Sequence, residues 1–242
     1  MMQLRTKDWD SAFFGYPVAS LELHSPATTW AEVASSIREA SCRNIRLLYL
    51  FLSPVDDVVR SALQENVRYV GRKVDYVKDV PSSISMVPDP EIVPCRSFSV
   101  ALERLALQSG EFSRFRLDRG FHQQEFERLY HEWLTSSIAN MDEKCVFIAG
   151  DESHPKGMIT LERSDILRIG LFAVDPMQQR QGIGRKLMKR AEHFCTQHHV
   201  KKLYVATQAD NRKACLFYES WGFKINNETD VFHVWLPSKQ FE

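Results

Sequence analysis

The chain is organised around residues 171–184, LFAVDPMQQRQGIG. The first four of these residues are apolar and predict a short strand, and Asp175 and Pro176 mark the turn that follows it. Apolar residues then recur at three- and four-residue steps over 183–194, so one face of a long helix can pack on a sheet. A strand followed by such a helix indicates an α/β fold.

The start of this helix has the properties of an anion-binding site. First-turn N–H groups lack intrahelical partners, and the helix dipole adds partial positive charge there. Gly182 and Gly184 remove side chains that would block a ligand. We therefore expect a pyrophosphate to bind at this turn. The alternative is an ordinary amphipathic helix with two glycines near its start.

Two common phosphate motifs do not fit the stretch. A P-loop requires Lys-Ser or Lys-Thr after its last glycine, and a Rossmann fingerprint requires Gly or Ala where Leu187 stands. The spacing Gln179-x-x-Gly182-x-Gly184 instead resembles the Gln/Arg-x-x-Gly-x-Gly/Ala signature of the GCN5-related N-acetyltransferase (GNAT) superfamily. Arg180 stands where many members carry glycine, but its backbone N–H is still available.

A second motif follows at residues 211–223. Asn211 opens a predicted helix, Tyr218 lies seven residues later on the same face, and Gly222 ends the helix. This order resembles the later GNAT motif, which implies that Asn211 contacts the pantetheine arm and Tyr218 protonates the departing thiolate. A helix N-cap and a core aromatic are the structural alternatives. A strand N–H near Ala173 or Val174 is expected to stabilise the oxyanion.

The resemblance implies acetyl-CoA as cofactor, with coenzyme-binding residues in both motifs. These are Phe172, Ala173, Val174, Gln179, Arg180, Gln181, Gly182, Ile183, Gly184, Arg185, Asn211, Ala214 and Phe217. Tyr218 is the candidate catalytic residue. A general base is harder to identify, because Glu162, Asp165 and His233 all lie on or near strands expected to border the cleft, and a water relay leaves no mark in a sequence.

Two further stretches resemble the TDP-fucosamine (TDP-4-amino-4,6-dideoxygalactose) N-acetyltransferase family: residues 9–15 (WDSAFFG) and 113–116 (SRFR). That family acetylates the amine of a nucleotide-linked deoxysugar used in surface polysaccharides. The resemblance implies an amino-sugar nucleotide as the small-molecule acceptor. The candidate substrate-binding residues are Arg114, Arg116, Glu162 and His233. Arginines of this segment, Arg119 included, suit phosphate contacts, and interdomain ion pairs are the alternative.

Other functions stay open. A GNAT enzyme that acetylates a peptide N-terminus, a lysine, a polyamine or an antibiotic would carry similar motifs. A non-catalytic acyl-CoA-binding domain is the alternative from another functional class.

The rest of the chain alternates strands and helices. Predicted strands cover residues 18–23, 46–52, 69–78, 145–149, 157–162 and 202–207, with a strand at 166–174 and a closing pair at 223–225 and 231–236. Predicted helices cover 29–42, 56–64, 98–109, 123–139 and 211–221, and residues 113–118 are expected to be irregular. Prolines and serines make 81–94 the linker candidate.

These elements predict an α/β (α+β) GNAT fold with a mixed central sheet, flanking helices and splayed strands. We assign it to residues 91–242, beside a small α/β domain in residues 1–90.

Composition narrows the possible partners. Lys+Arg and Asp+Glu both total 31, so the net charge gives no indication of nucleic-acid or membrane binding. Five cysteines without a C-x-x-C pair or metal-site spacing indicate reduced thiols in a cytoplasmic protein without a metal. The polar N-terminus predicts no signal peptide, and no apolar run reaches the roughly 18 residues of a membrane span. Homodimer formation is left open.

Overall fold

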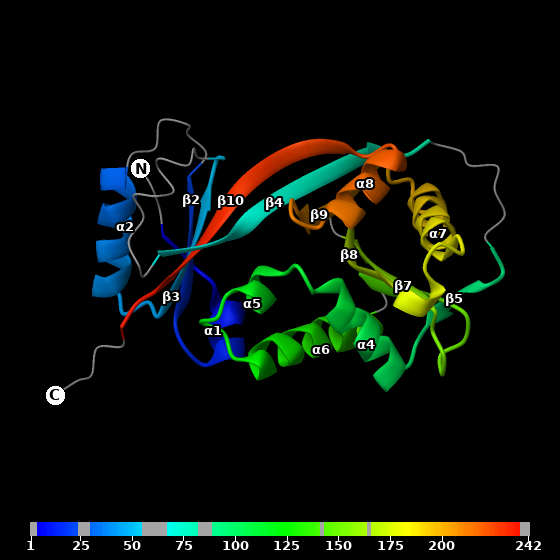
Figure 1. Cartoon of the computed structure of the whole chain (residues 1–242), viewed down its shortest axis with the longest axis horizontal. Coiled ribbons are helices and arrows are strands. Elements are labelled where there is room, and N and C mark those ends of the chain that lie inside the picture. Colours follow the sequence, from blue (N-terminus) through cyan, green and yellow to red (C-terminus); the bar gives the residue numbers. More distant parts are fainter. Residues whose placement is uncertain are drawn as a thin grey trace.

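The computed structural model describes residues 4–23, 30–54, 67–81, 89–140, 143–163 and 166–237. Within these ranges a single ten-stranded mixed sheet runs along the long axis of the molecule (Figure 1). Its strand order is β1-β2-β3-β10-β4-β9-β8-β7-β6-β5. The predicted mixed sheet with flanking helices is confirmed.

The elements have the following bounds. The strands are β1 (Arg5–Thr6), β2 (Val18–Leu23), β3 (Leu47–Leu52), β4 (Val67–Asp79), β5 (Ile92–Cys95), β6 (Lys144–Ala149), β7 (Gly157–Arg163), β8 (Leu167–Val174), β9 (Lys202–Gln208) and β10 (Lys224–Trp235). The helices are α1 (Asp8–Phe14), α2 (Trp30–Cys42), α4 (Val100–Ser109), α5 (Arg114–Leu117), α6 (Gln123–Ala139), α7 (Ile183–Gln197) and α8 (Arg212–Ser220), with a 3-10 turn η1 (Pro176–Gln178).

Three predictions of local structure were wrong. The expected closing pair is one continuous strand, β10, because its polar middle pairs with β4 while its last residues pair with both β4 and β3. The linker candidate contains strand β5, which pairs with β6. The expected irregular segment contains helix α5, which Ser113 caps by accepting from the Phe115 N–H. The predicted helix 56–64 and the predicted helix start at Thr29 lie outside the described residues.

The sheet does not stop between the two halves of the chain. Strand β4 pairs with β9 and β10, and β10 also pairs with β3. A boundary at residue 90 therefore separates strands that share one sheet. The division into an N-terminal domain and a GNAT domain stays a prediction.

Helices cover the two faces of the sheet separately. Helices α4, α5 and α6 pack against one face, where Met158, Leu171 and Ala173 point. Helix α7 packs against the opposite face, with Ile159 and Leu161, and α8 packs beside it. Helix α2 covers the N-terminal strands (Figure 1). None of the helices in the described ranges is long and apolar enough to cross a membrane.

The sheet splits between β8 and β9, its parallel strands in the C-terminal half. These two strands pair only at their beginnings, up to Ile169 and Val205. An irregularity between β7 and β8 changes the direction of β8, and there the Leu171 N–H donates to Thr160 Oγ1 at 2.7 Å. Beyond it β8 follows β7 while β9 follows β4. The predicted splayed strands are therefore present.

Candidate active site

The turn before α7 contains two residues in the left-handed region. Arg180 has a φ of 64° and Gly182 a φ of 80°. A Cβ added at Gly182 would meet nothing within 4 Å, so glycine there serves the backbone conformation. Arg180 adopts the same conformation at about 1–3 kcal/mol of strain. The departure from the motif therefore leaves the shape of the turn intact.

The backbone of this turn keeps its donors free. The N–H groups of residues 180–185 donate to no backbone carbonyl of the described residues, and Lys186 is the first to do so, to the Gly182 carbonyl at 3.1 Å. Gln179, Gln181 and Arg185 are exposed, whereas Ile183 anchors the helix start in the core. These free donors at the positive end of α7 fit a diphosphate.

Three elements meet next to this turn. A Cβ added at Gly184 would lie 3.5 Å from Phe217 of α8 and 3.6 Å from Phe172 of β8, which is ordinary contact. The rings of Phe172 and Phe217 are 5.4 Å apart between centroids. The packing of the protein thus has room for a methyl group at Gly184 and does not itself require a glycine. A ligand that must approach the backbone explains the glycine better than packing does.

The hydrogen bonds of β8 indicate which of its amides face the split. The N–H groups of Leu171 and Asp175 are directed at β7, where the latter donates to the Lys156 carbonyl at 2.9 Å. Strand alternation then directs the Phe172 and Val174 amides toward the split. The expected oxyanion donor is therefore Val174 or Phe172, because the intervening Ala173 N–H points toward β7.

The Val174 carbonyl is already occupied. It accepts from Gln108 Nε2 at 2.9 Å and from Gln179 Nε2 at 3.3 Å. These two amides hold the end of β8 in place, one from α4 and one from the anion-binding turn. Gln108 was not among the candidates from the sequence.

Tyr218 lies in the core beside the split, and only 4% of its surface is exposed. Its ring centroid is 6.3 Å from that of Phe172 and 5.9 Å from that of Tyr76. Burial raises the pKa of Tyr218, so the phenol keeps its proton. Its hydroxyl forms no hydrogen bond with any described residue. The placement suits both a core aromatic and a proton donor, and the catalytic role stays a prediction.

Asn211 is the N-cap of α8. Its side chain accepts from the Ala214 N–H at 3.2 Å, so the structural alternative is present. The amide nitrogen of Asn211 forms no hydrogen bond with a described residue. Contact between Asn211 or Ala214 and a pantetheine arm stays a prediction.

The predicted acceptor-side residues do not come together. Glu162 lies beside the split, with its Oε1 3.5 Å from a Cβ added at Gly170, and it pairs with Lys144 at 3.4 Å. Arg116 is exposed and lies over the Phe126 ring of α6, at 5.3 Å. Asp165 falls outside the described residues.

His233 is far from the split. It pairs with Arg68 on β4, five residues beyond the Lys73–Gln208 pair that ends the β4–β9 ladder, or roughly 17 Å along the strand. Burial lowers the pKa of His233 to about 4, so the ring is neutral. This position makes His233 a poor candidate for the general base at the thioester.

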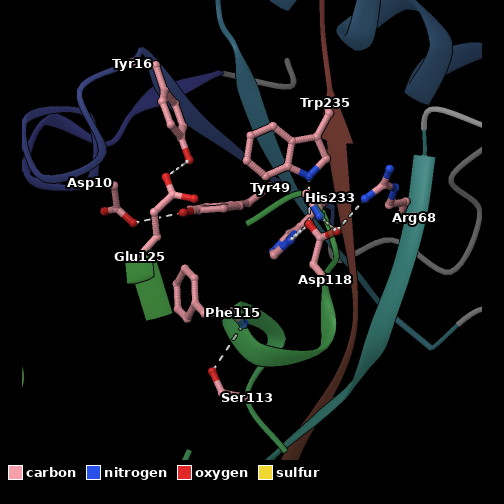
Figure 2. A network of polar contacts seen from close by, with 11 residues as sticks. Asp10, Tyr16, Tyr49, Arg68, Ser113, Phe115, Asp118, Glu125, His233 and Trp235 are labelled. Atoms are coloured by element: carbon pink, nitrogen blue, oxygen red, sulfur yellow. Dashed lines mark hydrogen bonds and ion pairs between the residues drawn. The ribbon is translucent and has the colours of Figure 1, made fainter. Parts of the chain in front are cut away.

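His233 belongs to a buried network around Asp118 (Figure 2). The Asp118 carboxylate accepts from His233 Nδ1 at 2.8 Å, Trp235 Nε1 at 2.7 Å, Arg68 Nη1 at 3.0 Å and the Gly120 N–H at 2.9 Å. Burial alone would favour the neutral acid, but these donors hold the pKa of Asp118 well below its usual range. This network could not be predicted from the sequence, because its members lie far apart in the chain.

Arg114 is directed into an aromatic cluster. Its Cζ is 4.2 Å from the ring centroid of Tyr49, 4.6 Å from that of Phe115 and 5.2 Å from that of Phe51. It forms no ion pair with a described residue, and desolvation lowers its pKa. Tyr49, next to it, donates to Asp10 at 3.1 Å (Figure 2). Arg114 therefore stabilises the packing of α5 on the sheet through cation–π contacts.

Comparison with known proteins agrees with this geometry. Residues 106–223 match the model of the acetyltransferase (GNAT) family. The chain is 28% identical over 95 residues to uncharacterized protein YxbD of Bacillus subtilis, covering 38% of this chain and 58% of that protein. It is 28% identical over 81 residues to a spermine/spermidine N(1)-acetyltransferase of the same organism, covering 33% of this chain and 48% of the relative. The chain thus spans about half the length of these relatives.

Two solved structures resemble more of the chain. A functionally unknown conserved protein from Staphylococcus epidermidis has a TM-score of 0.62 at 13% identity, covering 91% of this chain and 85% of that one. A GCN5-related N-acetyltransferase from Sphaerobacter thermophilus has a TM-score of 0.54 at 13% identity, covering 89% and 72%. At this identity the likeness shows the fold alone. Residues 106–223, just under half of the chain, are therefore similar to the acetyltransferase (GNAT) family, a family of acetyl-CoA-dependent enzymes.

Proposed function

We propose that this protein is an acetyl-CoA-dependent N-acetyltransferase that acts on the amine of a nucleotide-linked amino-deoxysugar of the TDP-fucosamine type. One observation carries the activity. The free amides of residues 180–185 lie where β8 and β9 separate, and Phe172 and Phe217 connect that turn to Tyr218. The match of residues 106–223 to the GNAT family model supports the cofactor.

The chain's own groups have distinct tasks in this reaction. The amides of the turn before α7 hold the coenzyme diphosphate, and Phe172 and Phe217 line the path along the split. Acetyl-CoA supplies a thioester. The Val174 or Phe172 N–H stabilises negative charge on its carbonyl oxygen. The acceptor amine forms the new C–N bond as the C–S bond breaks, and Tyr218 gives its proton to the thiolate. Glu162 or water takes the proton of the amine.

The choice of acceptor is supported by the contacts between two distant stretches. Residues 9–15 and 113–116, which carry the resemblance to the amino-sugar enzymes, lie against each other through Phe14 and Phe115, whose rings are 6.1 Å apart. Asp10 and Arg114 both contact Tyr49 between them. The two stretches that carry the resemblance therefore form one packed unit.

A polyamine is the second candidate acceptor. The spermine/spermidine acetyltransferase relative favours it. Arg68 and Arg119 argue against it, because both line a cavity beside strand β4 where they would repel a polycation.

Thiol release from acetyl-CoA tests the proposal. We expect turnover with a TDP-linked amino-deoxysugar and little with spermidine or a lysine peptide. Turnover of spermidine with none of the sugar nucleotide would contradict the acceptor, and turnover of no amine despite tight coenzyme binding would favour a non-catalytic acyl-CoA-binding domain.

A further inference from the structure

A cavity of about 410 Å³ lies where β4 continues past the end of β9. Its lining residues come from β4 and from the end of α5. They are Arg68, Tyr69, Val70, Leu117, Asp118 and Arg119. Of its lining residues on β4, Val70 lies roughly 10 Å and Arg68 roughly 17 Å along the strand from the end of the β4–β9 ladder. An acceptor held there by one end must be longer than a free monosaccharide to reach the split.

The cavity has an excess of positive charge. Arg68 and Arg119 face a single carboxylate, Asp118. Arg119 is exposed and forms no ion pair with a described residue, and the Arg68 side chain remains 46% exposed although it pairs with Asp118. Both guanidiniums therefore have N–H groups left for a ligand.

The network behind the cavity is held together by several hydrogen bonds. Asp118 accepts from His233, Trp235 and the Gly120 N–H as well as from Arg68, so its charge does not depend on Arg68 alone. A Cβ added at Gly120 would lie 2.1 Å from Trp235 Nε1, so only glycine fits there. Figure 2 shows Asp118 between Arg68 and the His233–Trp235 pair. The scaffold fixes the guanidinium of Arg68 at the cavity wall.

We infer that this cavity binds the diphosphate of the acceptor, with Arg68 and Arg119 as its ligands and Asp118, His233 and Trp235 as the residues that position Arg68. Planar guanidiniums suit bidentate contact with phosphate oxygens. The inference rests on the proposed function. It replaces the two arginines predicted from the sequence, because Arg114 points into the aromatic cluster and Arg116 lies over α6.

Calorimetric titration with inorganic pyrophosphate and with thymidine diphosphate tests the inference, on full-length protein saturated with coenzyme A. Filling the coenzyme site first prevents the probes from binding at the turn before α7. We expect Arg119→Gln and Arg68→Gln each to raise the Kd of both probes about tenfold or more. Arg116→Gln is the matched control and should change Kd less than about twofold, because that arginine lies outside the cavity.

Folding and binding are separated by two further measurements. Thermal unfolding checks Arg68→Gln, which leaves Asp118 with one donor fewer, and Arg68→Lys should recover part of the affinity through its charge. No binding to the wild type, or equal losses in Arg116→Gln and Arg119→Gln, would overturn the inference. Failure to bind coenzyme A would instead count against the proposed function, and pyrophosphate binding alone would then still report on the cavity.

Discussion

The two regions proposed to bind anions are built differently. Before α7 the donors are backbone amides of six consecutive residues, 180–185. At the cavity beside β4 the donors are the side chains of Arg68 and Arg119, and the residues that position Arg68 come from β10 and from the segment after α5. The first site depends on local backbone geometry and the second on packing between distant segments. A substitution in the first should therefore change coenzyme binding, and one in the second should change acceptor binding and stability.

The largest effect is expected at the reaction centre. Tyr218→Phe should lower kcat about a hundred- to ten-thousandfold, because the phenol is the proposed proton donor. The Kd of acetyl-CoA should change less than about twofold, since the ring and its contacts remain. Steady-state kinetics and calorimetry measure the two quantities.

Tyr76→Phe is the matched control for that change. Tyr76 is equally buried and packs on Tyr218, but its hydroxyl donates to Glu219 at 2.8 Å. It should retain most of kcat. Unchanged turnover in Tyr218→Phe would leave that residue as a core aromatic and remove the proposed acid.

The pH dependence of the free energy of unfolding reports on the buried network beside the β4 cavity and not on the turn before α7. His233 has a folded pKa of about 4, below the ordinary value of 6.5, so the unfolded chain binds more protons between these pH values. The free energy of unfolding should be fully developed above pH 6.5 and fall as pH drops toward 4, by on the order of 3 kcal/mol. Asp118, whose folded pKa is depressed, should lower stability further in stronger acid.

Urea unfolding at a series of pH values measures this slope. His233→Gln should flatten it between pH 6.5 and 4, whereas His154→Gln should not, because His154 is exposed. An equally steep slope in His233→Gln would show that the buried network does not set the acid stability.

Replacing Gly157 or Gly184 by alanine is expected to give the smallest effects, one on stability and the other on coenzyme binding. At Gly157 a Cβ would lie 3.0 Å from the Ala173 carbonyl and 3.1 Å from Ile183, so Gly157→Ala should destabilise the fold by about 1–3 kcal/mol. At Gly184 the same atom makes ordinary contacts, so Gly184→Ala should leave the Tm nearly unchanged. It should instead raise the Kd of acetyl-CoA about five- to a hundredfold, because the ligand must approach there. A loss of Tm without loss of coenzyme affinity in Gly184→Ala would contradict the site.

Elements that depend on residues close together in the chain were predicted well from the sequence. Helix α6 was predicted with its observed bounds from apolar periodicity, and the glycine turn was located from its spacing. Both ends of strand β10 were predicted, but its continuity was missed. The polar residues Asn226, Asn227 and Glu228 interrupt the apolar pattern, whereas pairing with β4 on one side is enough to continue the strand. Asn227 and Glu228 have partners on β4 that a local pattern does not reveal.

The arginines proposed for the acceptor side show most clearly what could not be predicted from the sequence. Arg114 and Arg119 are close in sequence and both are basic, yet one lies on the rings of Tyr49 and Phe115 and the other lines the cavity. Arg68, on a strand fifty residues earlier, has no motif around it. Which arginine lines the cavity is decided by packing between distant segments, and the residue type alone does not reveal it.

By itself the sequence determined the α/β class, the strand–turn–helix with its free amides and the order of the coenzyme motifs, because each depends on residues within two or three turns of one another. The tertiary structure alone decided the joining of both halves into one sheet, the distance of His233 from the split and the pairing of Arg68 with Asp118. These features depend on strand register and on the packing of α5 against β4, and both arise only when segments distant in the chain meet.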